Sequence, residues 1–209
     1  MFSLNLALFI LVVVFVVGWF AVGTQYNVRK GEDALRWLQQ GLPQIGGKTT
    51  LRWLGSSVVE LKIQQAKAPF RDAEVLIVLE PRDVALLWAI ARLRGRRDLL
   101  IIRGALQRAP RVELEASDPQ SWVLGSRDRR IRSEAWSAQS VPPLTVHSPA
   151  NFSTAAAVAN VALADAVPPV RLAVRRTPPN LELQWQLRRV RRYSALHLVD
   201  AVNHIADSV

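Results

Sequence analysis

The chain contains no cysteine, which excludes disulfide bonds, thiolate metal sites and cysteine nucleophiles. Aromatic residues are scarce as well: there are 15 in all, and nine of them follow Val28. The core of a folded domain must therefore be mainly aliphatic. Charge is missing from residues 4 to 23, and every Lys, Arg, Asp and Glu lies after Val28. One uncharged run followed by a charged chain with ample Leu and Val argues against a polytopic transporter and against a disordered tail.

The uncharged run, Leu4–Gly23, predicts a membrane-spanning helix. About 20 residues, rising 1.5 Å each, cover the ~30 Å hydrocarbon core. Trp19, Phe20 and Tyr26 gather at its C-terminal end, where amphipathic rings favour the headgroup layer. A cleaved signal peptide is the rival interpretation, but such a peptide has a basic start and a shorter apolar stretch. We therefore expect residues 4–23 to have the lipid bilayer as their partner.

The flanking charge predicts the orientation of this helix. No basic residue precedes the run, whereas Arg29, Lys30 and Arg36 follow it closely. Basic residues beside a membrane span are retained on the cytoplasmic side. The sequence thus predicts a single-pass membrane protein with an external N-terminus and most of its chain in the cytoplasm.

The pattern after the anchor predicts an α+β fold. We divide the chain into a transmembrane anchor (1–28), a juxtamembrane helix and turn (29–48), a first α+β unit (49–117), a polar loop or linker (118–140) and a second α+β unit with a C-terminal helix (141–209). Strand-like runs at 49–54 and 57–64, separated by Gly55 and Ser56, predict a hairpin. Residues 84–93 are apolar nearly all round and predict a buried helix.

The two units have the same predicted order of strand, helix, strand, strand. Pro81 corresponds to Pro149 at an offset of 68 residues, and residues 110–114 (PRVEL) correspond to 179–183 (PNLEL) at an offset of 69. These near-equal offsets are consistent with a duplicated βαββ unit. The identities are few, so coincidence stays open beside duplication.

Motifs that carry chemistry are weak in this sequence. The glycine-rich stretch 41–49 has Leu42 where a phosphate-binding loop needs its first glycine, and strand-like residues follow it instead of a helix. His197, Asp200 and His204 would share a helix face, but two imidazoles and a carboxylate do not complete a structural zinc site. Glu80 follows a buried strand, where capping of the next helix is the favoured role. No set of residues indicates a cofactor, a metal or a catalytic site.

Positive charge is the strongest remaining signal, with a formal net charge of +10. Arginine outnumbers lysine by 23 to 4, a bias that is typical of proteins encoded by GC-rich bacterial genomes. Arginines cluster at 92–97, 127–132 and 188–192. Candidate contacts to an anionic surface are Arg94, Arg96, Arg97, Arg129, Arg130, Arg132, Arg188, Arg189, Arg191 and Arg192.

Two interpretations of these clusters are equally open: binding to anionic lipid headgroups, and general solubility with local ion pairs to Asp98, Asp128 and Glu134. Nucleic acid is disfavoured as a partner because few aromatics are interleaved for base stacking. The sequence predicts a membrane-anchored, non-catalytic adaptor or assembly subunit with an unidentified protein partner. The alternative is a membrane-tethered enzyme or nucleotide-binding protein with an unrecognised site.

Overall fold

A single long helix begins the fold. The computed structural model describes residues 2–123, 136–149, 152–165 and 167–209. Helix α1 (Phe2–Leu38) is unbroken over 37 residues and, among the described residues, is the one helix long and apolar enough to cross a membrane. The predicted juxtamembrane helix is therefore the C-terminal part of α1 and not a separate element, since no proline interrupts the chain between Gly23 and Leu38.

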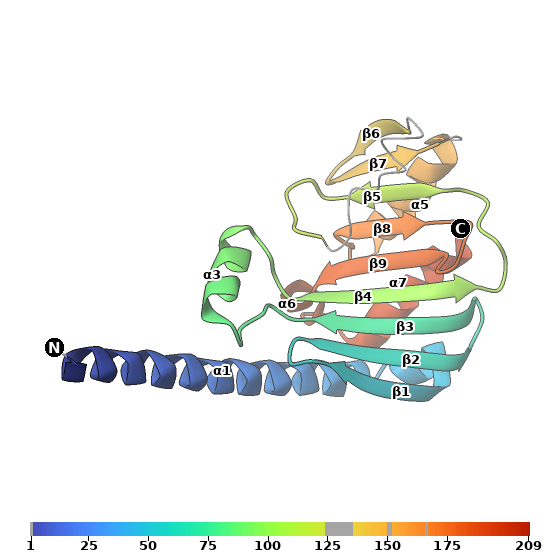
Figure 1. Cartoon of the computed structure of the whole chain (residues 1–209). Coiled ribbons are helices and arrows are strands. Elements are labelled where there is room, and N and C mark those ends of the chain that lie inside the picture. The colour runs from blue at the N-terminus through green and yellow to red at the C-terminus, as the bar shows by residue number, and fades with distance from the viewer. Residues whose placement is uncertain (1, 124–135, 150–151, 166) are drawn as a thin grey trace.

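A nine-stranded sheet forms the body of the protein, and all of its strand pairs are antiparallel (Figure 1). The order across the sheet is β1-β2-β3-β4-β9-β8-β5-β7-β6. The strands are β1 (Gly46–Leu54), β2 (Val58–Ala66), β3 (Phe70–Val78), β4 (Leu99–Leu106), β5 (Leu114–Ser117), β6 (Ser137–Val141), β7 (Leu144–Ser148), β8 (Arg171–Val174) and β9 (Leu181–Gln186). The α+β class predicted from the sequence is confirmed.

The predicted hairpin is present where β1 and β2 pair around Gly55. Gly55 has a φ of +72°, a left-handed conformation that favours glycine. Strand β6 was not predicted and arises from the C-terminal end of the predicted linker. The centre of that linker, including Arg127–Arg132, lies outside the described residues.

Both predicted α+β units contribute to the same sheet, but their strands are not arranged alike. In the first unit β3 pairs directly with β4, whereas the corresponding strands of the second unit, β7 and β8, are separated by β5, which belongs to the first unit. The second unit's helix, α5 (Phe152–Ala164), buries four residues, whereas the first unit's helix, α3 (Ala85–Leu93), buries none. The strand pairing therefore gives no support to the duplication, which stays a hypothesis about the sequence.

One face of the sheet carries the hydrophobic core. Helices α5 and α7 (Ala195–Asp207) lie on the same side of the sheet (Figure 1), and the short α2 (Leu42–Ile45) packs against α7. Alternate residues of each strand point into this layer, so Leu181, Leu183 and Trp185 of β9 are all buried. The core is mainly aliphatic, as the scarcity of aromatic residues predicts.

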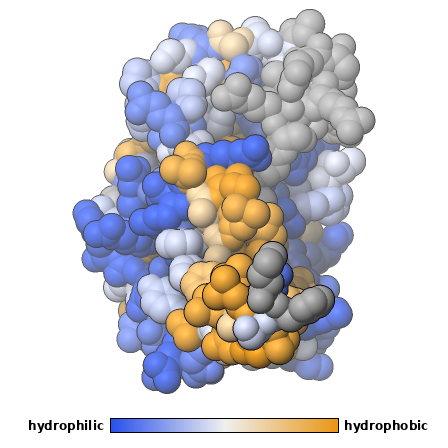
Figure 2. Space-filling view, turned by 60° about the vertical axis from the view of Figure 1, so that its left-hand side comes forward, coloured by the Kyte–Doolittle hydropathy of each residue, from blue (hydrophilic) through white to orange (hydrophobic). Residues whose placement is uncertain are grey.

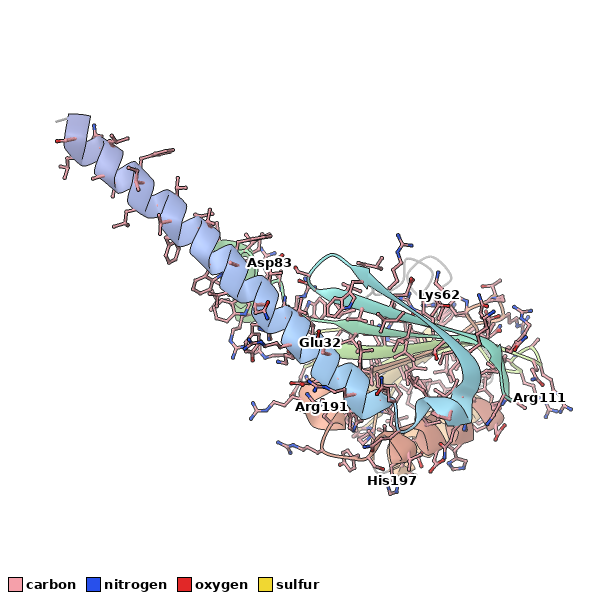
Figure 3. All side chains as sticks on the ribbon, turned by 90° about the horizontal axis from the view of Figure 1, so that it is seen from below. Glu32, Lys62, Asp83, Arg111, Arg191 and His197 are labelled. Atoms are coloured by element: carbon pink, nitrogen blue, oxygen red, sulfur yellow. The ribbon has the colours of Figure 1, made fainter. Side chains whose placement is uncertain are left out.

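Helix α1 is docked directly on the sheet without a flexible linker. Ala34 and Leu38 are buried in the core cluster, and a Cβ at Gly31 would lie 2.5 Å from the ring of Trp53. Figure 3 shows the N-terminal part of α1 extending away from the domain, with Asp83 beside the helix where it leaves. The apolar N-terminal run and the part of α1 that packs on the domain therefore belong to one continuous helix.

The prediction that residues 84–93 form a buried helix is wrong in one respect. They do form α3, but none of its residues is buried: Leu86 is 70% exposed and Leu93 87% exposed. The helix lies beside α1 and away from the sheet, running across the direction of α1 (Figure 1). An all-round apolar pattern predicts an apolar environment but does not distinguish a protein core from a bilayer.

Candidate functional site

A cleft of about 1030 Å³ opens between α1, α3 and one end of the sheet. At this end β3 and β9 finish and β4 begins, so the loops that follow or precede these neighbouring strands converge. We call this space the interfacial cleft, because Trp19, Val22 and Gly23 from the end of the apolar run form one of its walls. Four aromatic side chains line it: Trp19, Tyr26, Trp88 and Trp122.

Asp98, immediately before β4, is the main acceptor at the base of the cleft. The Arg82 guanidinium donates to both of its carboxylate oxygens, at 2.9 and 3.0 Å, and Lys30 Nζ of α1 lies 2.6 Å from Oδ2. The backbone N–H of Glu80 donates a further hydrogen bond to Oδ1 at 2.7 Å. Burial alone would raise the pKa of Asp98, but these donors outweigh it and hold the pKa below its ordinary value. Asp98 is therefore a fixed negative charge that links α1 to the sheet.

Glu80 lies beside Asp98, and its carboxylate contacts side chains of α3. Its carboxylate accepts a hydrogen bond from Trp88 Nε1 at 2.8 Å and lies 3.4 Å from guanidinium nitrogens of Arg82 and Arg92. The favoured sequence interpretation, that Glu80 caps the following helix, is wrong. The N-cap of α3 is Val84, which makes no side-chain cap hydrogen bond.

Helix α1 closes the cleft by contacts that require particular residues. Trp19 Nε1 donates to the carbonyl oxygen of Arg82 at 2.9 Å, and the fully buried Asn27 donates to the carbonyl oxygen of Glu80 at 3.0 Å. A Cβ at Gly23 would lie 2.1 Å from the same Arg82 oxygen, so only glycine permits this approach. The Trp19 ring also lies 6.0 Å from that of Trp88, which joins the apolar run to α3.

Basic side chains greatly outnumber acidic ones around the cleft. The two acidic residues are Glu80 and Asp98. The basic lining residues are Lys30, Arg82, Arg92, Arg97, Arg188, Arg189 and Arg192. Of these, Lys30, Arg82 and Arg92 pair with the two carboxylates, and the other four have no acidic partner among the described residues. The backbone N–H of Leu187 donates to the carbonyl oxygen of Asp98 at 2.9 Å, which places α6 (Leu187–Val190) beside Arg97.

The structure brings together four of the ten arginines predicted to contact an anionic surface: Arg97, Arg188, Arg189 and Arg192. Three others lie nearby but do not line the cleft: Arg94, Arg96 and Arg191. Arg96 stacks on Trp122, with its guanidinium carbon 5.1 Å from the ring centroid. Arg129, Arg130 and Arg132 lie outside the described residues. Contact with an anionic surface stays a prediction for all ten.

A second charged cluster crosses the other face of the sheet. Glu182 accepts hydrogen bonds from Arg103 at 2.9 Å and from Arg171, and Arg171 also donates to Glu115. At its edge, burial and a hydrogen bond with Glu60 raise the pKa of Glu74. Its buried carboxylates have arginine partners, which favours a structural role, since a buried charge is costly unless paired.

The weaker sequence candidates do not join the interfacial cleft. His197 is exposed on α7, and His204 Nδ1 lies 3.7 Å from Asp165. No group of three or more His, Cys, Asp or Glu side chains that could hold a metal ion occurs within the described ranges. His147 lies in β7, and Gly46 and Gly47 begin β1.

A comparison of the chain with protein-family models found no match, and neither did a comparison with curated proteins.

Proposed function

We propose that the chain is a single-pass membrane protein whose basic α+β domain works at the cytoplasmic bilayer surface as a non-catalytic adaptor or assembly subunit. The observation that carries the proposal is α3, an apolar helix with no buried residue beside the end of the apolar run. Helix α3 lies in the bilayer interface, so that the domain is held by two membrane contacts.

The exposed side of α3 has the composition of an interfacial helix. Leu86, Leu87, Ile90 and Leu93 recur at three- and four-residue spacing and remain 70, 55, 38 and 87% exposed. Figure 2 shows the apolar surface continuing from α1, seen end-on, onto this side of the molecule, with hydrophilic residues beside it. Complete burial of one such side chain contributes ~1.5–3 kcal/mol, so seating the four contributes about 4–7 kcal/mol. Arg94, Arg96 and Arg97 follow directly, where headgroups would lie.

Rigid coupling supports the adaptor role. Because α1 runs unbroken from the bilayer into the core, the domain stays at a fixed height above the membrane. Asp98 is held by Lys30 and Arg82, and its lowered pKa makes it a counter-charge at neutral pH and not a proton donor. The basic residues that follow the apolar run favour the cytoplasmic side.

Labelling of single cysteines tests the seating of α3, because the chain has no cysteine of its own. Leu93→Cys is compared with Leu196→Cys, an exposed position on α7. In sealed inside-out vesicles, a water-soluble maleimide is expected to label Leu196→Cys readily and Leu93→Cys at least tenfold more slowly. Equal labelling would contradict the interfacial position of α3. Labelling of Leu196→Cys only in right-side-out vesicles would contradict the cytoplasmic orientation.

The adaptor role is tested separately on the full chain. Purification in mild detergent followed by a high-salt wash removes partners held by exposed charges alone. A protein retained at a constant ratio to the chain is the expected result. Turnover of a substrate by the washed protein, lost on substitution of Glu80, would instead support a membrane-tethered enzyme.

A further inference from the structure

The interfacial cleft has a basic side and an apolar side. The carboxylates at its base are paired, one side carries Arg97, Arg188, Arg189 and Arg192, and Trp19 and Val22 of α1 line it together with Trp88 of α3. We call the part formed by these three residues its mouth. A ligand that satisfies both must have an anionic group and an apolar part. This inference rests on the proposed seating of α3, because that seating brings the mouth to the headgroup layer.

The basic side holds exposed arginines that have no acidic partner among the described residues. Within the part of the chain that the structure describes, Arg97 donates to the backbone carbonyl oxygens of Arg92 and Arg96. Arg188, Arg189 and Arg192 make no ion pair with any described acidic residue, although all three line the same space. Four exposed like charges at one wall favour the entry of an anion. Guanidinium groups match the geometry of phosphate oxygens through paired N–H donors.

The apolar side distinguishes a lipid from a free phosphate. The exposed residues of α3 and the end of the apolar run form a continuous apolar surface beside the mouth (Figure 2). Acyl chains attached to a bound phosphate would lie along this surface with those of the surrounding bilayer, whereas a free phosphate would make no contact with it. The cleft of about 1030 Å³ is large enough for a headgroup with its glycerol.

We propose that the interfacial cleft binds the phosphate of an anionic glycerophospholipid. The phosphate lies among Arg97, Arg188, Arg189 and Arg192, and the acyl chains lie along α3. Lys30 and Arg82 are committed to Asp98 and hold the base of the cleft in place.

The test uses the full chain in nanodiscs of phosphatidylcholine with increasing fractions of phosphatidylglycerol. After transfer to mild detergent, native mass spectrometry counts the phosphatidylglycerol molecules retained on each protein. We expect one retained molecule on the wild type. Each neutralised arginine weakens retention about fivefold, so a variant carrying Arg188→Gln, Arg189→Gln and Arg192→Gln is expected to bind about a hundredfold more weakly.

A matched variant controls for net charge. Arg52→Gln, Arg108→Gln and Arg176→Gln remove the same charge from exposed residues outside the cleft and are expected to leave retention unchanged. Equal loss in both triple variants would overturn the proposal, because it would show a general charge effect. Displacement of the lipid by millimolar glycerol phosphate would overturn the lipid assignment and favour a site for the phosphate group alone.

The two proposals can fail separately in this test. Leu93→Cys is labelled in the same phosphatidylcholine nanodiscs. Slow labelling without a retained lipid would refute the lipid site and leave the seating of α3 intact. Labelling as fast as that of Leu196→Cys would refute both.

Discussion

Asp98→Asn provides the sharpest test of the link between α1 and the domain. The substitution keeps the shape of the side chain and an acceptor for the Glu80 N–H, but removes the charge that faces Lys30 and Arg82. Loss of one partner from a buried ion pair costs ~3–5 kcal/mol. The Lys30 side chain remains 29% exposed and can be partly hydrated, so we expect the lower end, about 3 kcal/mol.

The measurement is the free energy of unfolding by urea in detergent micelles, followed by tryptophan fluorescence. Asp72→Asn is the matched control, because Asp72 pairs with Arg71 at the surface, where both side chains are at least 60% exposed. An exposed pair contributes about 0–1 kcal/mol. If Asp98→Asn lowered the free energy of unfolding no more than Asp72→Asn, the proposed linkage through Asp98 would be refuted. A double-mutant cycle with Lys30→Met should give a coupling of about 1–2 kcal/mol between α1 and the sheet.

Three further outcomes are expected. The fold lowers the pKa of Asp98, so its ionised carboxylate stabilises the fold fully above the ordinary pKa of 3.8, and this stabilisation is lost as the pH falls through the folded value. Unfolding measured as a function of acid pH should show this loss in the wild type and not in Asp98→Asn. Gly23→Leu should separate α3 from α1 and make Leu93→Cys reactive to maleimide, whereas Gly18→Leu, where a Cβ meets nothing within 4 Å, should not. Trp19→Phe removes the hydrogen bond to Arg82 and should lower the free energy of unfolding by about 1 kcal/mol; an unchanged value would argue that this bond forms no better than one to water.

Local patterns predicted many of the elements of this fold. The apolar run, the hairpin at Gly55, the α+β class and the C-terminal helix capped by Ser194 follow from hydropathy and turn chemistry, which act over a few residues. The strand order does not follow from these patterns. The insertion of β9 between β4 and β8 depends on contacts between segments about 80 residues apart, and no local pattern encodes them.

The sequence predicted some residues of the interfacial cleft and missed others. The arginine runs indicated Arg97 and Arg188–Arg192, because clustering is a local property. Arg82 and Lys30 were missed as cleft residues, since neither belongs to one of the arginine clusters and each acquires its role only when α1 lies beside the end of β3. A tryptophan in the span and a second in an apolar helix, Trp19 and Trp88, were the available signal for their contact. The burial of α3 was predicted wrongly because an apolar composition does not by itself say that a helix packs in the protein core.

Because α1 is continuous, the distance and the rotation between any two of its residues are fixed by helix geometry. Two of its contacts with the domain are well separated along the helix: Trp19 donates a hydrogen bond to Arg82, and Gly31 lies against Trp53. One residue inserted between these points would turn one contact relative to the other by roughly 100° and shift it by about 1.5 Å, so both could not persist. An insertion before Phe15 would only lengthen the free end. In the membrane arrangement that we propose, a change in bilayer thickness would therefore be met at the N-terminal end of the helix and would not rotate the domain about the helix axis.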